Sequence, residues 1–305
     1  MKIDIGIKDN KHTLLSYFRG RAQEAVAEAD REYSNSEFKK KAAYVNKALS
    51  ESRDNLLSIV ENKAKSEHWM TVDLLECALM IYYTNDVVML ETRNSIWEYD
   101  YMAFSRRIGE LWEPFCKLCF KYSLAEISFF LPPLFSEVKQ HLSDEIKTYI
   151  DHLTITKNKK IQLLKYYDKV WALVTSGEIK LECDLHFIKN GTKYIIDFKS
   201  GFGSNEKGNT NRLLLVGTIY NNIDDENYKC MLFVRSAENN HYLTTLSSSG
   251  VWATYTGEST YRQIEECSGY DLHKWITTNI DWMNDFSILM RKTVLDQDLE
   301  KYLIW

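Results

Sequence analysis

The sequence predicts an α/β (α+β) protein in which a large α-helical N-terminal region precedes a shorter run of strands and helices. Between about residues 12 and 175, apolar residues recur every three or four positions, as at Leu56, Val60 and Ala64, which is the spacing of one helix face. After Gly177 the apolar spacing changes to two, which is typical of a half-buried strand. The middle of the chain then reads α-β-β-α-β.

The helical region should contain several separate helices. We expect breaks near Ser34–Ser36, near Tyr83–Asp86 and at Pro132–Pro133, because a proline ring does not fit inside a helix. The stretch 157–174 predicts one more amphipathic helix. We therefore divide the chain into a helical region, 1–156, and a core with C-terminal helices, 157–305, which could also form one continuous domain.

A β-hairpin is the clearest local prediction. The segment EIKLECDLHF (178–187) alternates strictly, with Ile179, Leu181, Cys183, Leu185 and Phe187 on one face and Glu178, Lys180, Glu182, Asp184 and His186 on the other. Asn190-Gly191 follows, and this pair is typical of a two-residue hairpin turn because both residues tolerate positive φ. The second strand is KYIIDFKS (193–200). The hairpin therefore has a predicted register.

Further elements follow the hairpin with weaker signals. We expect a Gly/Asn-rich loop (201–211), a helix at about 212–222 and a strand at 228–236. A further hairpin around 241–256 and helices near 258–266 and 271–292 complete the prediction.

Composition and charge exclude several classes of protein. With 45% hydrophobic and 27% charged residues in 305, the chain is neither disordered nor collagen-like. Its net charge of −5 gives no whole-molecule attraction to nucleic acid, but residues 157–235 hold 13 Lys and Arg against 9 Asp and Glu. The positive charge is therefore concentrated around the hairpin.

Cysteine usage and hydropathy predict a cytoplasmic protein. The six cysteines follow no disulfide spacing, the N-terminal residues lack an apolar signal segment, and no apolar run reaches the roughly 18 to 20 residues of a membrane helix. Cys116-x-x-Cys119 has no second Cys or His pair, so we expect core cysteines rather than a zinc site.

The hairpin register brings acidic residues together. If Asn190 and Gly191 form the turn, Asp184 lies opposite Asp197, and Glu182 lies opposite Lys199. Like charges directly opposed across two strands are destabilising, and a divalent cation would offset this repulsion. Carboxylates around a hard cation are typical of a Mg²⁺ site, and phosphodiester hydrolysis is its obvious use.

The order of Asp184 and then Asp197-Phe198-Lys199 on the next strand resembles the PD-(D/E)XK nuclease superfamily. The resemblance covers roughly residues 157–236 and implies a mixed sheet flanked by helices and Mg²⁺-dependent cleavage of nucleic acid. It makes Asp184 and Asp197 metal ligands, the carbonyl of Phe198 a further ligand, and Lys199 the catalytic lysine.

The resemblance has two departures. Cys183 stands where the family has proline. The family's additional glutamate has no clear equivalent: strand geometry favours Glu182 as a catalytic residue, whereas Glu137 and Glu145 are alternatives from the preceding region.

The loop GFGSNEKGNTNR (201–212) is similar to a phosphate-binding P-loop, but Asn209 stands where the phosphate-binding lysine is needed, so we expect no nucleotide cofactor. In a nuclease, its polar side chains would suit contacts with DNA phosphates and base edges. These candidates are Ser204, Asn205, Lys207, Asn209, Asn211 and Arg212.

Within the superfamily, the chain looks most like a type II restriction endonuclease. Such enzymes cut double-stranded DNA at a short site and are usually homodimers, since a two-fold protein matches a two-fold site. The string YIIDFKSG also resembles a RecB-type exonuclease, with Tyr220 available on the next helix but Arg212 in place of the expected glutamine. A third possibility is a non-catalytic nucleic-acid-binding adaptor.

Overall fold

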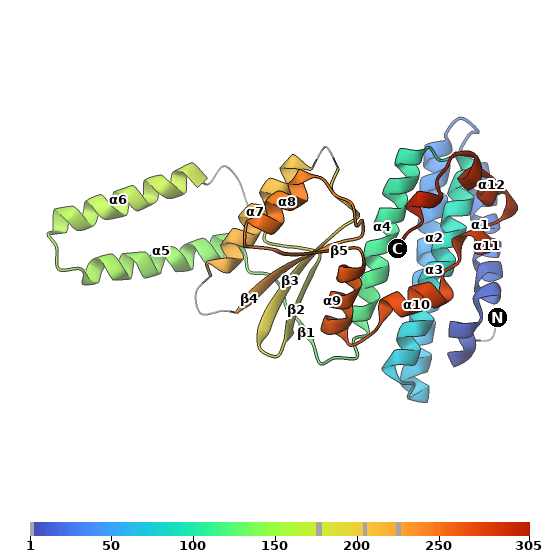
Figure 1. Ribbon diagram of the computed structural model, residues 1–305, viewed down its shortest axis with the longest axis horizontal. Coiled ribbons are helices and arrows are strands. Elements are labelled where there is room, and N and C mark those ends of the chain that lie inside the picture. Colours follow the sequence, from blue (N-terminus) through green and yellow to red (C-terminus); the bar gives the residue numbers. More distant parts are fainter. Residues whose placement is uncertain (1–2, 175–178, 204–205, 224–226) are drawn as a thin grey trace.

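The molecule is elongated and has three parts in a row: a helical bundle, a central sheet and a projecting pair of helices (Figure 1). The computed structural model describes residues 3–174, 179–203, 206–223 and 227–305. It confirms the predicted mixed α/β class with a large helical N-terminal region.

The bundle is built from both ends of the chain. Its elements are the 3₁₀ helix Ile5–Asp9, α1 (Lys11–Glu32), α2 (Phe38–Glu67), α3 (Thr71–Ile96), α4 (Tyr101–Lys121), α10 (Leu272–Asn279), α11 (Trp282–Asp285), α12 (Ile288–Asp296) and the 3₁₀ helix Glu300–Tyr302. Asp285 connects the two ends, since its carboxylate accepts hydrogen bonds from Lys11 at 2.8 Å and from the Tyr83 hydroxyl at 2.6 Å.

The expected helix break near Tyr83–Asp86 is wrong, because α3 runs through these residues without interruption. Their side chains are buried, and two of the polar ones donate hydrogen bonds to backbone carbonyls. Thr84 donates to the Met80 carbonyl, and the Asn85 amide donates to Leu49 of α2. Tertiary packing thus overrides the local preference of these residues for turns. The breaks after α1 and before α5 occur as predicted.

The central sheet is mixed and has the order β1-β2-β3-β4-β5. The strands are β1 (Ser128–Phe129), β2 (Leu185–Lys189), β3 (Thr192–Lys199), β4 (Tyr228–Val234) and β5 (Ala253–Thr256). β1, β2 and β3 pair antiparallel, whereas β3, β4 and β5 pair parallel. The parallel connections contain α7 (Lys207–Asn221) and α8 (His241–Ser248), as such crossovers require.

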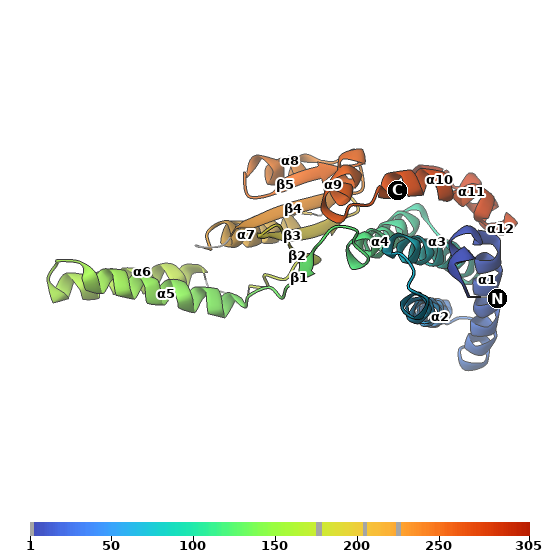
Figure 2. The same ribbon diagram turned by 90° about the horizontal axis from the view of Figure 1, so that it is seen from below.

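Both faces of the sheet are covered by helices (Figure 2). On one face, α4 and α9 (Glu258–Ser268) contribute to the large core, where the Trp112 ring lies 5.7 Å from Phe198 and Phe120 lies 5.4 Å from Phe187. On the other face, α7 and α8 form a second, smaller core around β3 and β4. Asp197 points toward this second core, in the same row as Ile195.

Three strand and helix predictions need correction. The strand expected at 178–187 begins only at Leu185, because the chain before it leaves the sheet to place Leu181 and Cys183 in the second core. The hairpin expected at 241–256 is instead α8 followed by the parallel strand β5. The loop after β3 is shorter than expected, since α7 already begins at Lys207.

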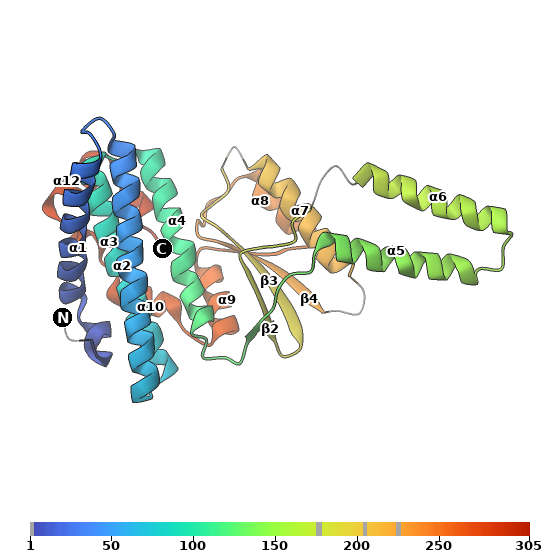
Figure 3. The same cartoon turned by 180° about the vertical axis from the view of Figure 1, so that it is seen from behind.

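The third part is an arm made of α5 (Phe135–His152) and α6 (Lys157–Val174), which lie side by side and project away from the bundle (Figure 3). The boundary drawn from the sequence between residues 156 and 157 falls in the connection between these two helices. Among the described residues, no helix is long and apolar enough to cross a membrane.

Candidate functional site

The hairpin turn fixes the geometry of the site. Asn190 and Gly191 have φ angles of 51° and 76°, as a two-residue hairpin turn requires. The pairs run from Lys189–Thr192 to Leu185–Ile196, which confirms the register predicted for these residues. The next pair in that register would be Asp184–Asp197.

Asp184 reaches β3 through its side chain, because β2 begins one residue after it. Its Oδ2 accepts a 2.7 Å hydrogen bond from the backbone N–H of Phe198. Its negative charge is close enough to raise the pKa of Asp197. The structure therefore brings the two predicted acids together, although not as a ladder pair.

Asp197 is a fully buried carboxylate between two cations. Its Oδ1 forms an ion pair with Lys199, and its Oδ2 accepts a 2.9 Å hydrogen bond from Arg212. Burial raises the pKa of Asp197, and the charge of Lys199 opposes this shift. The Lys199 and Arg212 side chains are 20% and 41% exposed, so solvent reaches the site from their side.

The oxygens around Lys199 suit a hard cation. Its ammonium group donates to the Phe198 carbonyl at 3.1 Å and pairs with Asp197, so a positive charge already lies on two of the three groups predicted to bind metal. Within the described ranges, no cluster of three or more His, Cys, Asp or Glu side chains could hold a metal. Mg²⁺ often needs only one or two carboxylates, with water and substrate phosphate completing its shell. Asp184, Asp197 and the Phe198 carbonyl fit that requirement.

Among the residues that the structure describes, no third carboxylate joins this pair. Glu182 is exposed and lies before β2, so its predicted pairing with Lys199 does not form. Glu137 accepts the backbone N–H of Leu134 at the start of α5, and Glu145 lies 3.6 Å from His141 on the same helix. Neither alternative glutamate contacts the hairpin acids.

Residues of the second core form hydrogen bonds with the segment that precedes Asp184 and so position it. The Tyr220 hydroxyl on α7 donates to the Leu181 carbonyl at 2.9 Å. The ring of His186 lies between Phe130 and Tyr220, and its Nε2 accepts from the Cys183 N–H at 3.4 Å. Burial lowers the pKa of His186, which favours the neutral ring. His186, expected on a polar face, is therefore a buried structural residue.

The predicted DNA-contacting loop is divided by the structure. Ser204 and Asn205 lie outside the described residues. Lys207 and Asn211 are exposed in the first two turns of α7, and Asn209 donates to Glu206 at 3.0 Å.

Arg212 has a different position from that expected, since it contacts Asp197 rather than projecting from a loop. The early start of α7 places it in the second turn of a helix that packs on the sheet. The run of apolar residues directly after Arg212 indicates a buried helix, but it does not indicate that the helix begins early enough to bring Arg212 to Asp197.

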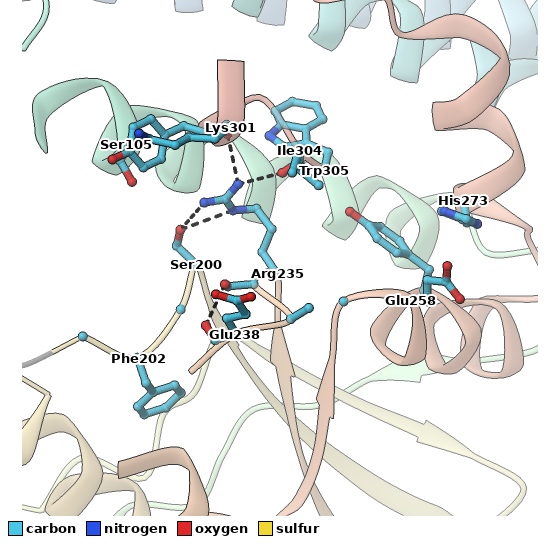
Figure 4. Close-up of a pocket in the computed structure, with 17 residues that line it drawn as sticks. Ser105, Ser200, Phe202, Arg235, Glu238, Glu258, His273, Lys301, Ile304 and Trp305 are labelled. Carbon is cyan, nitrogen blue, oxygen red and sulfur yellow. Dashed lines mark hydrogen bonds between the residues drawn. The ribbon is translucent and has the colours of Figure 1, made fainter. Parts of the chain in front are cut away.

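A cavity of about 900 Å³ lies next to this site, at the carboxyl ends of the three parallel strands (Figure 4). Ser200, directly after Lys199, and Arg235, directly after β4, line it. The Arg235 guanidinium donates to Ser200 Oγ at 3.0 Å and to the Ile304 carbonyl at 2.7 Å. No carboxylate in the described part of the chain pairs with it. Arg235 was not among the predicted site residues: its position directly after an apolar strand indicates where β4 ends, but not which groups its guanidinium contacts.

The six cysteines are all unpaired and buried, as predicted for Cys116 and Cys119.

Comparison with known proteins gave no match to any family model, curated protein or solved structure.

Proposed function

We propose that this protein is a Mg²⁺-dependent endonuclease that cuts double-stranded DNA at a short specific site, in the manner of a type II restriction enzyme. The observation that carries the proposal is the contact of Asp184 with the backbone N–H of Phe198, beside the buried Asp197 and its partner Lys199. Two acids and a lysine at one point of a mixed sheet are the arrangement that the resemblance to PD-(D/E)XK nucleases implies.

Each residue has a distinct part in the proposed chemistry. Asp184, Asp197 and the Phe198 carbonyl would hold Mg²⁺, which when bound would polarise the scissile phosphate and lower the pKa of a water molecule. Lys199 would leave Asp197, orient the attacking water and stabilise negative charge on the phosphate. Arg212 would remain with Asp197 and offset the repulsion between the two acids.

The proposed enzyme acts as a homodimer, because cutting both strands at a two-fold site needs two active sites. The six unpaired cysteines favour the reducing environment of the cytoplasm. A RecB-like exonuclease is the second candidate, favoured by the position of Tyr220 on the helix after the D-x-K strand, although Tyr220 is buried and bound to Leu181.

Plasmid DNA incubated with the protein in Mg²⁺ or in EDTA tests the proposal. We expect discrete fragments when Mg²⁺ is present and intact DNA in EDTA. In the variants Asp197→Ala and Lys199→Ala, the cleavage rate should fall at least about 100-fold. Lys229→Ala, an exposed lysine on the neighbouring strand β4, is the matched control and should cut normally. Circular dichroism would establish that each variant folds.

The other outcomes separate the alternatives. Progressive shortening from DNA ends would favour the exonuclease. Intact DNA under all conditions, or normal cutting by Asp197→Ala, would refute the assignment and favour a binding adaptor.

A further inference from the structure

The arm, residues 135–174, extends beyond the sheet on the side opposite the bundle (Figures 1 and 3). Its base is anchored to the second core by Phe135, whose ring lies 6.2 Å from that of Trp171. Ile150, near the other end of α5, is also buried. The two helices therefore pack on each other, and the outer faces of the arm remain available.

The outer surface of α6 is strongly basic. The helix holds five lysines and a single acid, Asp168. Four of the lysines are exposed: Lys157, Lys159, Lys165 and Lys169. None of these four pairs with a carboxylate of the described residues. In the bundle, by contrast, lysines such as Lys8 and Lys11 form ion pairs with acids.

No described acid of α5 forms an ion pair with these four lysines, and three of its four acids have partners on α5 or at its start. Glu137 accepts the N–H of Leu134. Asp144 accepts from Gln140 and lies 3.8 Å from Lys147, and Glu145 lies near His141. The lysines of α6 therefore present unbalanced positive charge on a chain whose net charge is −5.

The length and position of α6 suit a DNA duplex. An 18-residue helix is about 27 Å long, which corresponds to roughly eight base pairs. The chain passes from the end of α6 to Asp184 in ten residues. The basic helix and the acidic pair are therefore joined by a short connection.

We propose that α6 binds the phosphate backbone of duplex DNA beside the cleavage site, through Lys159, Lys165 and Lys169. This inference rests on the proposed nuclease function and adds a sequence-independent binding surface to it. Lysines on a preformed helix contribute to affinity by releasing counterions from DNA, so the contribution decreases as salt increases.

Binding of a fluorescent duplex, measured across salt concentrations in Ca²⁺ or EDTA, tests the proposal without needing cleavage. The variant is Lys159→Glu, Lys165→Glu and Lys169→Glu together. The control is Lys65→Glu, Lys274→Glu and Lys292→Glu, three exposed lysines on the bundle, which change the net charge equally. We expect the arm variant to bind at least about 10-fold more weakly, with the slope of log K against log salt reduced by about 2 to 3. The control should change both quantities much less.

Three results would overturn the proposal. Equal affinity and slope in the arm variant and the wild type would exclude α6 as a DNA contact, while the cleavage site could still stand. A change in sedimentation mass without a change in DNA binding would instead make the arm a subunit interface, formed by exposed apolar side chains such as Leu163 and Val170. Absence of DNA binding by the wild type would refute the proposed function together with the arm.

Discussion

Asp86 shows how one buried residue can link stability to pH. It lies in the middle of α3 and is 1% exposed, and neither carboxylate oxygen has a hydrogen-bond partner among the described residues. Burial raises the pKa of Asp86 to about 7, although Arg53 and Arg107 oppose the shift. In the unfolded chain the pKa returns to its ordinary value near 3.8.

Because the folded protein holds the Asp86 proton more tightly, the free energy of unfolding should fall as pH rises from about 4 to 7 and then level off. Asp86→Asn cannot titrate, so we expect it to gain on the order of 3 kcal/mol relative to wild type between pH 4 and pH 8. Urea unfolding at a series of pH values measures this difference. Asp168→Asn, exposed on α6, is the control. Parallel stability curves for wild type and Asp86→Asn would contradict the prediction.

At the same scale, the candidate site shows what a sequence can predict about single side chains. Asp184, Asp197 and Lys199 could be grouped because a two-residue turn determines which positions are opposite one another. Arg212 and Arg235 could not be placed, because their contacts depend on where α7 starts and on how the last residues of the chain return to β4. Glu182 was misplaced because apolar alternation also occurs in a segment that leaves the sheet and still buries every second residue.

At the scale of elements, the hairpin depends on the backbone conformation of its turn. Gly191 has a φ of 76°, and a Cβ built there would meet no atom within 4 Å. Gly191→Ala should therefore destabilise the protein by about 1 kcal/mol through backbone strain alone. Gly20, in the interior of α1, also has open space around it, and Gly20→Ala should stabilise by up to about 1 kcal/mol.

Urea unfolding of the two variants compares these opposite effects directly. If both alanines changed stability in the same direction, the turn conformation would not be the cause.

The elements themselves were predictable where their signals are local. The period of the long helices, the Asn-Gly turn and the apolar strand β4 gave the α-β-β-α-β order and the hairpin register. The errors at Tyr83–Asp86 and at 241–256 have a shared physical origin. In both places contacts with other elements stabilise a helix: Asn85 donates to Leu49, and Leu243 and Leu246 of α8 are buried in the second core.

At the scale of the whole molecule, the bundle meets the sheet where α4 approaches the end of β3. This contact could not be predicted from the sequence, because it depends on the absence of a side chain at Gly109. A Cβ on Gly109 would lie 2.3 Å from Ser200 Oγ and 2.5 Å from Ser200 Cβ. Ser200 directly follows Lys199, and its hydroxyl oxygen accepts a hydrogen bond from the Arg235 guanidinium. The position of α4 is thus coupled to the candidate site.

Gly109→Ala should therefore destabilise the protein by about 1 to 3 kcal/mol, because helix and strand must separate. Ser200→Gly removes both clashing atoms but also the acceptor of Arg235, which should cost about 1 kcal/mol. In the double variant the alanine has room, so its free energy of unfolding should exceed the value expected from adding the two single effects. Urea unfolding of the four proteins gives this coupling energy, and a coupling of at least about 0.5 kcal/mol is expected for residues in contact. Strict additivity would mean that the alanine does not meet Ser200, so that α4 is coupled to the end of β3 only through other contacts, such as that of Trp112 with Phe198.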